Sequence, residues 1–500
     1  MANPLLEALF AVGAPSAPAI RLGPRTISYG ELLAQTGAWA AALRAAGVEA
    51  GDRIAAPIEK SIENLILYLA AVRAGAVWLP LNPAYTDVEL AYFLADAEPA
   101  LVVCDPPRRA ALAALDRARV ETLDPIGRGS MADLAAAGHA PAPPVARAAS
   151  DLAAICYTSG TTGRSKGAML TQANLLSNAS ALVDLWRFSA PDVLIHALPL
   201  YHVHGLFVAA HVTLLAGASM LLQPRFEPAA VLAAMGEASV LMGVPTFYSR
   251  LLAEPDLGPE SAGRMRLFVS GSAPLLEGTF TAWRARTGTT ILERYGLTET
   301  GMNASNPYDG ERRAGTVGRP LPDVDIRIAD PETGDPLALG GAGMIEVRGP
   351  NVFTGYWRNP ERTAEAFRPD GYFVTGDLGR LDGDGYLSIV GRAKDLVISG
   401  GFNIYPKEIE LLIDATPGVA ESAVIGLPHP DLGEALVAVV VAKAGAQLAE
   451  TDVLAALAPR LARYKQPRRV VFADALPRNV MGKVQKAALR DAYAGLFTAP

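Results

Sequence analysis

The chain has 500 residues, half of them hydrophobic, which is more than one hydrophobic core usually accommodates, so we expect two or more domains. Its formal net charge of −7 comes without a basic tract, so the sequence lacks the cationic footprint of a nucleic-acid-binding protein. Small-molecule chemistry is therefore the better starting hypothesis.

The sequence predicts neither a secretion signal nor a membrane span. The N-terminal stretch is apolar, but it contains Glu7 and no cation before Arg21, whereas a signal peptide begins with positive charge. The longest apolar run, LFVAAHVTLLAGASMLL, is interrupted by His211 and falls short of the roughly 20 residues that a spanning helix requires. Cys104 and Cys156 each end a strand-like run outside any metal-spaced cluster. We expect buried thiols and a soluble, cytoplasmic protein.

Helix and strand signals alternate over the first 150 residues. Ser28 and Glu31 have the spacing of a capping box and precede a helical apolar pattern that ends at Gly47, and residues 52–58 then have the pattern of a strand. The same alternation returns between residues 193 and 273. This order predicts α/β layers with largely parallel strands.

From about Val324 the pattern changes to two alternating strands joined by a turn rich in Pro, Gly and Asp, which indicates an antiparallel unit. The last hundred residues predict, in order, a helix, two strands, a helix and a strand over residues 406–414, 419–426, 435–442, 451–464 and 468–473. We therefore predict an α/β protein. Its large N-terminal domain, residues 1–392, has layered α/β subdomains and a β subdomain, and its small mobile α+β C-terminal domain comprises residues 393–500.

One loop has the composition of a phosphate-binding site. The segment YTSGTTGRSKGAML, Tyr157 to Leu170, places glycines, hydroxyl groups and the compact charge of Lys166 between two apolar runs. It is not a Walker A motif, because Ser165 stands where that motif has its second Gly and Gly167 where it has Ser or Thr. A flexible surface loop is the alternative. The flanking runs favour a strand-loop-helix unit that binds an anion.

Lysine is rare in this chain. Eight of the 44 basic residues are lysines, and six of these lie from Lys394 onward. Because Lys and Arg are not interchangeable at a phosphate or a reacting carboxylate, a retained Lys can mark a place that needs a compact ammonium. A mildly basic, solvated surface is the alternative for Lys443 and Lys465, whereas Lys166 and Lys483 lie in glycine-containing motifs.

Four further motifs follow the loop, namely RYGLTETG (294–301), GYFVTGDLG (371–379), VGRAKDLVISGGFNIYPKEIE (390–410) and PRNVMGKVQK (477–486). In order and content, the five motifs resemble those of the adenylate-forming superfamily of acyl-CoA synthetases, luciferases and peptide-synthetase adenylation domains, over essentially the whole chain. The resemblance implies an acid-thiol ligase that transfers AMP from ATP to a carboxylate, releases pyrophosphate, and passes the acyl group to coenzyme A. Such chemistry is mostly positioning and charge neutralisation.

The resemblance also implies a nucleotide site. The residues implied to bind ATP are Thr158, Ser159, Gly160, Thr161, Thr162, Gly163, Lys166, Gly271, Ser272, Ala273, Tyr295, Thr298, Asp377, Arg392 and Lys483. Of these, Thr298 would contact the α-phosphate, and the neighbouring Glu299 would hold Mg²⁺, an ion that takes one carboxylate together with phosphate oxygens and water. Tyr295 would lie against the adenine, and Asp377 would accept hydrogen bonds from the ribose hydroxyls.

Lys483 matches the adenylation lysine of the superfamily, so the resemblance makes it catalytic together with Thr298 and Glu299. It would bridge the substrate carboxylate and the α-phosphate as negative charge develops. Lys394 matches the hinge about which the small domain rotates, and Gly400 and Gly401 would then line the path of the CoA thiol.

Among members of the superfamily the sequence most resembles the malonyl-CoA synthetases, on YHVHGLF, GVPTFYSR, VSGSAPL and ERYGLTETGMNASNPYDG. A dicarboxylate needs a cation for its second carboxylate, because an unpaired buried charge is costly. The resemblance assigns this role to Arg250, with Ser272 as hydroxyl donor, His204 and Met302 in the pocket wall and His202 as its gate. It implies malonate and CoA as substrates, with malonyl-CoA, AMP and pyrophosphate as products.

Three alternatives stay open. The acid can be methylmalonate, or another short, medium-chain or aryl acid. The acceptor can be the phosphopantetheine arm of a carrier protein. A non-catalytic binding protein is the third, and the presence of Lys166, Glu299, Asp377 and Lys483 together argues against it.

Overall fold

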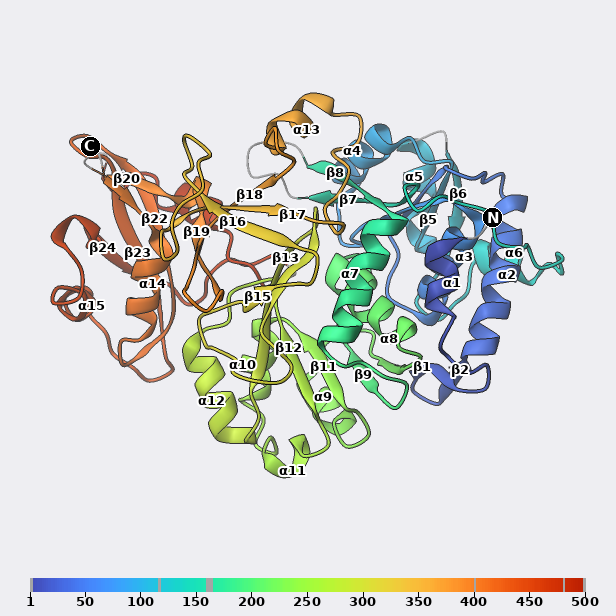
Figure 1. Ribbon diagram of the computed structural model, residues 1–500, viewed down its shortest axis with the longest axis horizontal. Helices are drawn as coiled ribbons and strands as arrows, with labels where there is room; N and C mark the ends of the chain where they lie inside the picture. Colours follow the sequence, from blue (N-terminus) through green and yellow to red (C-terminus); the bar gives the residue numbers. More distant parts are fainter. Residues whose placement is uncertain (1–2, 116–117, 159–164, 400–401, 480–481, 498–500) are drawn as a thin grey trace.

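The computed structural model describes residues 3–115, 118–158, 165–399, 402–479 and 482–497. Four β-sheets organise these residues, three in a large N-terminal domain and one in a small C-terminal domain, drawn at the left of Figure 1. The predicted mixed α/β fold with a large N-terminal and a small C-terminal domain is confirmed.

The largest sheet has nine strands in the order β15-β14-β13-β12-β11-β9-β10-β1-β2. The pairs from β13 to β1 are parallel, and antiparallel strands flank them at both edges. The strands are β1 (Pro18–Leu22), β2 (Arg25–Ser28), β9 (Val193–His196), β10 (Ser219–Leu222), β11 (Val240–Gly243), β12 (Leu267–Ser270), β13 (Ile291–Leu297), β14 (Gly301–Ser305) and β15 (Arg319–Pro320).

The second sheet has six strands in the order β6-β5-β3-β4-β7-β8 and is parallel except for the β7-β8 hairpin. Its strands are β3 (Arg53–Ala56), β4 (Val77–Pro80), β5 (Leu101–Cys104), β6 (Arg119–Thr122), β7 (Leu152–Thr158) and β8 (Lys166–Thr171). The prediction of largely parallel layers is confirmed for both sheets.

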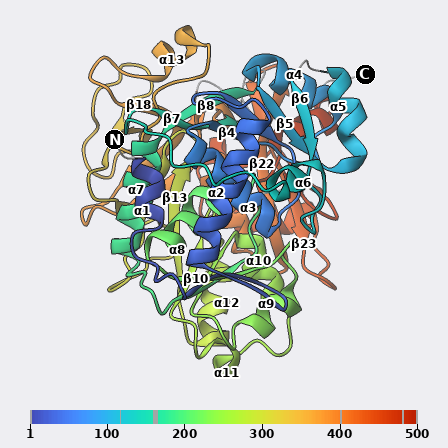
Figure 2. The ribbon, with the colours of Figure 1, turned by 90° about the vertical axis from the view of Figure 1, so that its right-hand side faces the viewer.

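Helices connect and cover these sheets. In the first half of the chain they are α1 (Pro4–Leu9), α2 (Tyr29–Ala45), α3 (Ile62–Ala74), α4 (Asp87–Ala97), α5 (Arg109–Leu115), α6 (Ser130–Ala136), α7 (Gln172–Leu185), a π-helix (His204–Ala210) and α8 (His211–Leu215). The predicted capping box is present at α2, where Glu31 N–H donates to Ser28 Oγ and Ser28 N–H donates to Glu31 Oε2. Helices α2 and α3 pack against each other (Figure 2).

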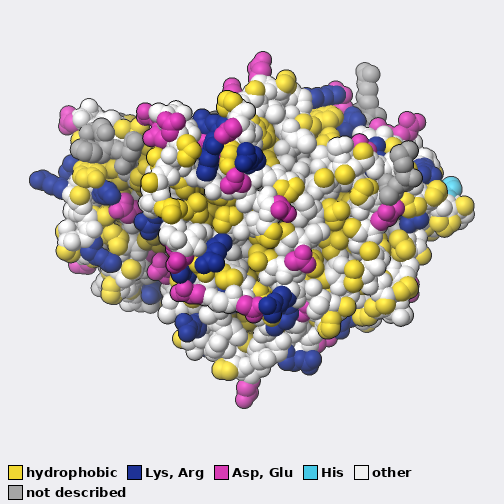
Figure 3. All heavy atoms as spheres, viewed as in Figure 1, with side chains coloured by type: hydrophobic (Ala, Val, Ile, Leu, Met, Phe, Trp, Pro, Cys, Tyr) yellow, Lys and Arg dark blue, Asp and Glu magenta, His cyan; other side chains and the backbone are white. Residues whose placement is uncertain are grey.

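The next helices of the large domain are α9 (Pro228–Ala234), α10 (Pro245–Leu251), α11 (Pro259–Ala262), α12 (Glu277–Thr287) and α13 (Pro360–Ala366). One continuous hydrophobic core joins the two large sheets through α2, α3 and α7, and both Cys104 and Cys156 are buried free thiols, as predicted. On the face seen in Figure 3, cationic and anionic side chains are interspersed. None of the helices in the described part of the chain is long and apolar enough to cross a bilayer.

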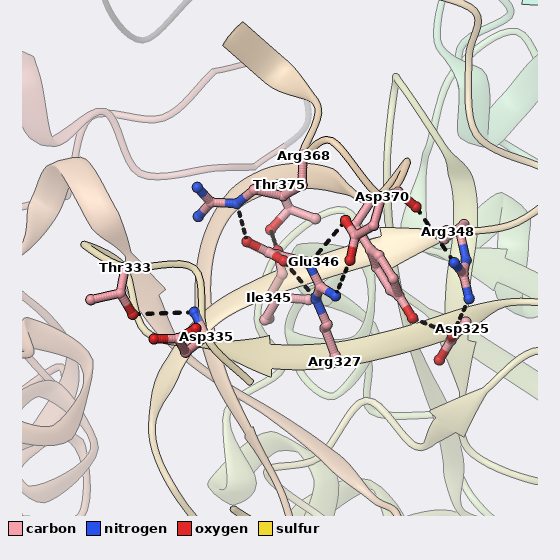
Figure 4. A network of polar contacts seen from close by, with 11 residues as sticks. Asp325, Arg327, Thr333, Asp335, Ile345, Glu346, Arg348, Arg368, Asp370 and Thr375 are labelled. Atoms are coloured by element: carbon pink, nitrogen blue, oxygen red, sulfur yellow. Dashed lines mark hydrogen bonds and ion pairs between the residues drawn. The ribbon is translucent and has the colours of Figure 1, made fainter. Parts of the chain in front are cut away.

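An antiparallel sheet of four strands, β16 (Asp325–Ala329), β17 (Gly343–Arg348), β18 (Phe373–Leu381) and β19 (Leu387–Arg392), forms the predicted β subdomain. Glu346 on β17 is fully buried and accepts from Arg327 Nε at 2.8 Å and from Arg368 Nε at 2.6 Å (Figure 4). Beside this network, Thr375 Oγ1 donates to the carbonyl of Ile345 at 2.7 Å. The network ties β16, β17 and the approach to β18 together.

After β19 a 3₁₀ turn (Ala393–Asp395) leads into the small domain. Its elements are β20 (Val397–Ser399), β21 (Phe402–Ile404), α14 (Pro406–Asp414), β22 (Val419–His429), β23 (Gly433–Ala442), α15 (Glu450–Leu457), a 3₁₀ turn (Arg463–Lys465), β24 (Arg469–Phe472) and α16 (Lys486–Ala492). Alternate residues of β22 and β23 enter two separate cores, one beneath α14 and α15 and one beneath α16. The predicted helix over residues 451–464 is shorter than expected, because Pro459 follows its C-cap.

Candidate active site

The predicted phosphate loop connects the two strands of the β7-β8 hairpin. Thr158 and Lys166 face each other across this hairpin, while Ser159, Gly160, Thr161, Thr162 and Gly163 lie outside the described residues. Strand β8 intervenes between the loop and helix α7, so the predicted strand-loop-helix unit is wrong in this detail. The reason is a distant partner, since Met169 N–H donates to the carbonyl of Gly355 and Trp357 N–H to that of Gly167.

The same contact brings Tyr356 between two predicted site residues. Lys166 Nζ lies 4.4 Å from the centre of the Tyr356 ring, and Tyr356 Oη donates to Glu299 Oε1 at 3.1 Å. Glu299 is half-buried in the turn that links β13 and β14, next to Thr298, and burial raises the pKa of its carboxyl above the ordinary value. Tyr356 was missed by the sequence reasoning, because nothing local in GYW indicates pairing with β8.

A second group forms around Asp377, which is almost fully buried. Asp377 and Arg392 are cross-strand neighbours on β18 and β19, and Arg392 Nε lies 2.7 Å from Asp377 Oδ1. Tyr295 Oη donates to Asp377 Oδ2 at 2.6 Å. Asp377 N–H donates to Thr375 Oγ1 at 3.0 Å, so the hydroxyl group seen in Figure 4 also holds the backbone of Asp377. Tyr295 and Arg392, which the sequence predicted separately, therefore both contact the carboxylate of Asp377.

The loop that carries Lys483 reaches this group from the small domain. It is closed by a hydrogen bond from Asn479 N–H to the carbonyl of Lys483, and Gly482 adopts a left-handed φ of +74°. A Cβ at Gly482 would lie 3.3 Å from Thr246, so the loop packs on the start of α10 in the large domain. Burial, with the charge of Arg392 nearby, lowers the pKa of Lys483 to about 8.

Lys394 lies in the 3₁₀ turn after β19, where burial lowers its pKa below the ordinary value. The other predicted residues of the small domain, Gly400 and Gly401, lie outside the described residues.

His204 and Ser272 are also in contact, with His204 Nδ1 3.2 Å from Ser272 Oγ. Ser272 follows Gly271 at the end of β12, precedes Ala273 and has an unusual left-handed φ of +71°. His202 Nδ1 accepts from the backbone N–H of His204, and burial lowers the pKa of His202 to about 4.

Arg294 lies beside these histidines and was not singled out by the sequence reasoning. The side chain is almost fully buried on β13, and within the described residues its Nε and Nη2 atoms have no hydrogen-bond partner. Gly271 is packed against it, since a Cβ there would lie 2.4 Å from Arg294 Cζ. Burial lowers the pKa of Arg294 to about 9. The usable signal was a charged pair, Glu293 and Arg294, inside an otherwise largely apolar strand.

Arg250 is placed differently. It is exposed at the end of α10, and its guanidinium carbon lies 5.0 Å from the centre of the Phe226 ring. Met302 is buried on β14, where its N–H donates to Asn178 Oδ1 at 3.0 Å. The structure thus brings His202, His204 and Ser272 together with Arg294, and Arg250 stays a predicted contact of the acid.

A large α/β domain with three sheets, joined to a small second domain that carries Lys483, is the architecture of a class of nucleotide-binding enzymes. Models of the AMP-binding enzyme family and of its C-terminal domain match residues 9–357 and 408–483, and the chain belongs to this family.

Within the family the chain is an AMP-forming acid–CoA ligase. It is 38% identical to a feruloyl-CoA synthase of Amycolatopsis sp. over 95% of this chain and 96% of that one, and 35% identical to a malonate–CoA ligase of Arabidopsis thaliana over 88% and 78%. The chain is also 58% identical to ATP-bound MatB from Rhodopseudomonas palustris, in an alignment that covers both chains fully. The TM-score between the two structures is 0.98, whereas the TM-score with the apo form of MatB is 0.87.

Proposed function

We propose that this enzyme ligates malonate to CoA. The malonate carboxylate would attack the α-phosphorus of ATP with pyrophosphate as leaving group, and the CoA thiol would then attack the malonyl-AMP carbonyl and release AMP. The observation that carries the choice of acid is Arg294, a buried guanidinium with unpartnered N–H groups next to Ser272 and His204.

A buried cation without a counter-charge is costly, and a carboxylate that meets it removes much of that cost. A guanidinium also matches a carboxylate geometrically, because two N–H groups can donate to its two oxygens. Monocarboxylic acids leave this cation unpaired once their one carboxylate is at the α-phosphate. The similarity to a malonate–CoA ligase supports the same choice. Arg250 remains a predicted further contact that would approach from the end of α10.

For the first step we propose that Lys483 neutralises charge between the acid and the α-phosphate, while Lys166 and the hydroxyl groups of residues 158–163 hold the outer phosphates. Asp377, Arg392 and Tyr295 would hold the ribose and adenine. Their position around the Lys483 loop supports this arrangement.

Glu299, with Tyr356 beside it, fits an Mg²⁺ ion that is bound to ATP. Among the described residues no three His, Cys, Asp or Glu side chains cluster as a complete metal site, and Mg²⁺ bound to ATP needs one protein carboxylate. Glu299 provides that carboxylate, and Tyr356 orients it. When bound, the ion would supply positive charge to the phosphates.

For the second step we propose that residues 393–500 rotate about Lys394 relative to residues 1–392, and that Gly400 and Gly401 then line the thiol path. We place the enzyme in the cytoplasm, where ATP and CoA are available.

Pyrophosphate release by the purified protein with ATP, Mg²⁺ and CoA tests the proposal across malonate, methylmalonate, acetate, octanoate, benzoate and ferulate. Malonate should exceed acetate, octanoate, benzoate and ferulate by about tenfold or more, because these monocarboxylates leave Arg294 unpaired. A lead by ferulate or octanoate would retain the ligase and overturn the substrate. Methylmalonate in first place would keep the dicarboxylate site and change its occupant. Acylation of a phosphopantetheine carrier in competition with CoA separates the two acceptor classes.

A further inference from the structure

Lys60 has no role in the site as described so far. With Lys166 it is one of two lysines in the first 393 residues, a part of the chain where arginine supplies almost all cations. It lies between β3 and α3, next to the N-cap Ser61, and is 7% exposed. A buried lysine is costly, so its surroundings need to compensate for the charge.

The compensation comes from three acceptors on one segment. Lys60 Nζ lies 2.9 Å from His196 Nδ1, 2.7 Å from the carbonyl of His196 and 2.7 Å from the carbonyl of Leu198. An ammonium group has three N–H donors, so each acceptor receives one. Although burial lowers the pKa of Lys60 well below the ordinary value, this set of acceptors favours the charged form.

His196 extends the contact to the other end of the same segment. Its Nε2 lies 2.8 Å from the carbonyl of Gly205, so Nε2 carries the proton and Nδ1 is left to accept from Lys60. Gly205 itself packs tightly, because a Cβ there would lie 2.0 Å from the carbonyl oxygen of Pro199. Lys60 and His196 therefore close the base of the segment over residues 196–205.

This closed segment carries His202 and His204, two members of the cluster with Ser272 and Arg294 where we propose that the acid binds. His204 begins the π-helix and contacts Ser272, and His202 accepts from the backbone of His204. Short π-helical segments frequently occur at functional sites.

We propose that Lys60, acting through His196, is a positioning residue for acid binding: it fixes residues 196–205 so that His204 stays against Ser272 and beside Arg294. The inference rests on the proposed function in taking this cluster as the place where the acid binds. Lysine suits the role because three acceptors converge on a single nitrogen, a geometry that the planar fork of arginine does not match.

The test measures KM for the acid, KM for ATP and kcat in variants of the full-length enzyme. Lys60→Met and His196→Leu each remove the connection, and each should raise KM for the preferred acid about tenfold while KM for ATP stays within about threefold. His196→Gln can still accept from Lys60 and donate to Gly205, so it should restore most of the acid affinity. The double variant should be no worse than either single one, since both break the same contact.

Tyr29→Phe is the matched control, because it removes another buried hydrogen bond, from Tyr29 Oη to the carbonyl of Ala218, without touching residues 196–205. A folded Lys60→Met enzyme with unchanged KM for the acid, or one with equal losses for acid and ATP, overturns the inference. If Lys60→Met does not fold, the difference between His196→Leu and His196→Gln decides in the same way. Should the wild type prefer an acid other than malonate, the proposed substrate fails, and the Lys60 variants are compared with the preferred acid instead.

Discussion

Asp377 and Arg392 face each other across β18 and β19, and Arg392 Nε lies 2.7 Å from Asp377 Oδ1. Asp377→Asn keeps the shape of the side chain and removes its charge. We expect KM for ATP to rise about tenfold or more, equivalent to the roughly 1.5–3 kcal/mol of a hydrogen bond to a charged group, with little change in KM for the acid. Steady-state kinetics with each substrate varied separately measure this difference. Equal increases for both substrates would contradict the assignment of Asp377 to the nucleotide.

The lowered pKa of Lys483 predicts the pH dependence of the first step. The lysine is charged below its pKa of about 8 and neutral above it, so kcat/KM for ATP should fall as the pH rises through about 8. Pyrophosphate exchange measured over a pH series provides the profile for the free enzyme.

Lys483→Arg separates charge from position in the same assay. It keeps the charge at high pH, so the fall near pH 8 should disappear, although the rate itself will be low because the guanidinium differs in shape. A fall that persists unchanged in this variant would assign the titration to another group.

Tyr356 links Lys166 and Glu299 through two different parts of its side chain. Tyr356→Phe removes the hydrogen bond to Glu299 and keeps the ring under Lys166. We expect kcat/KM for MgATP to fall by a factor that corresponds to about 1 kcal/mol of transition-state stabilisation. Tyr356→Leu also removes the ring and should lose about a further 0.5–1 kcal/mol. Titration of Mg²⁺ at fixed ATP should show a raised Mg²⁺ requirement in both variants. An unaltered requirement in both would separate Tyr356 from the metal.

The two arginines of the acid side are distinguished by burial. Arg294→Gln should lower kcat/KM for malonate by a factor that corresponds to about 3–5 kcal/mol of transition-state stabilisation, because it removes the buried partner of the second carboxylate. The turnover of acetate should change far less. Arg250→Ala starts from an exposed side chain and should cost about 0–1 kcal/mol if it forms only a surface contact with the acid. The malonate-to-acetate ratio of each variant is the measurement. A larger loss for Arg250→Ala than for Arg294→Gln would return the second carboxylate to Arg250.

The Glu346 network makes a prediction about stability alone. Glu346 is fully buried between Arg327 and Arg368, so Glu346→Gln should lower the free energy of unfolding by about 3 kcal/mol or more, the usual effect of breaking a buried ion pair (Figure 4). Chemical denaturation detects the change. Glu365→Gln, which alters an exposed pair with Arg362, is the control and should change stability by less than about 1 kcal/mol.

Local signals made much of the fold predictable. The capping box of Ser28 and Glu31 involves residues three positions apart, and it correctly located the start of α2. The helix over residues 406–414 was predicted with its true bounds, because Pro406 and a clear amphipathic pattern define it. Strand β8 was not predicted, since its second partner, residues 355–357, lies nearly 190 positions away and leaves no local trace.

The candidate site shows the same division. Motifs predicted the loop at 158–167, Asp377 and Lys483 as site residues. The pairing of Asp377 with Arg392 follows from strand register and the contact of Asp377 with Tyr295 from the packing of two sheets, and sequence patterns specify neither. Arg294 and Lys60 were missed as site residues because their importance depends on burial, and a charged residue that directly follows a glutamate, as both do, gives no local sign of being buried.

The 3₁₀ turn at Ala393–Asp395 begins directly after Arg392, the residue held by Asp377. A rotation of the small domain that starts at Lys394 would therefore exchange Lys483 for another segment while the Asp377–Arg392 pair stays with the large domain. The nucleotide would keep its ribose contacts during the exchange, so AMP could act first as the activating group and then as the leaving group without being bound anew.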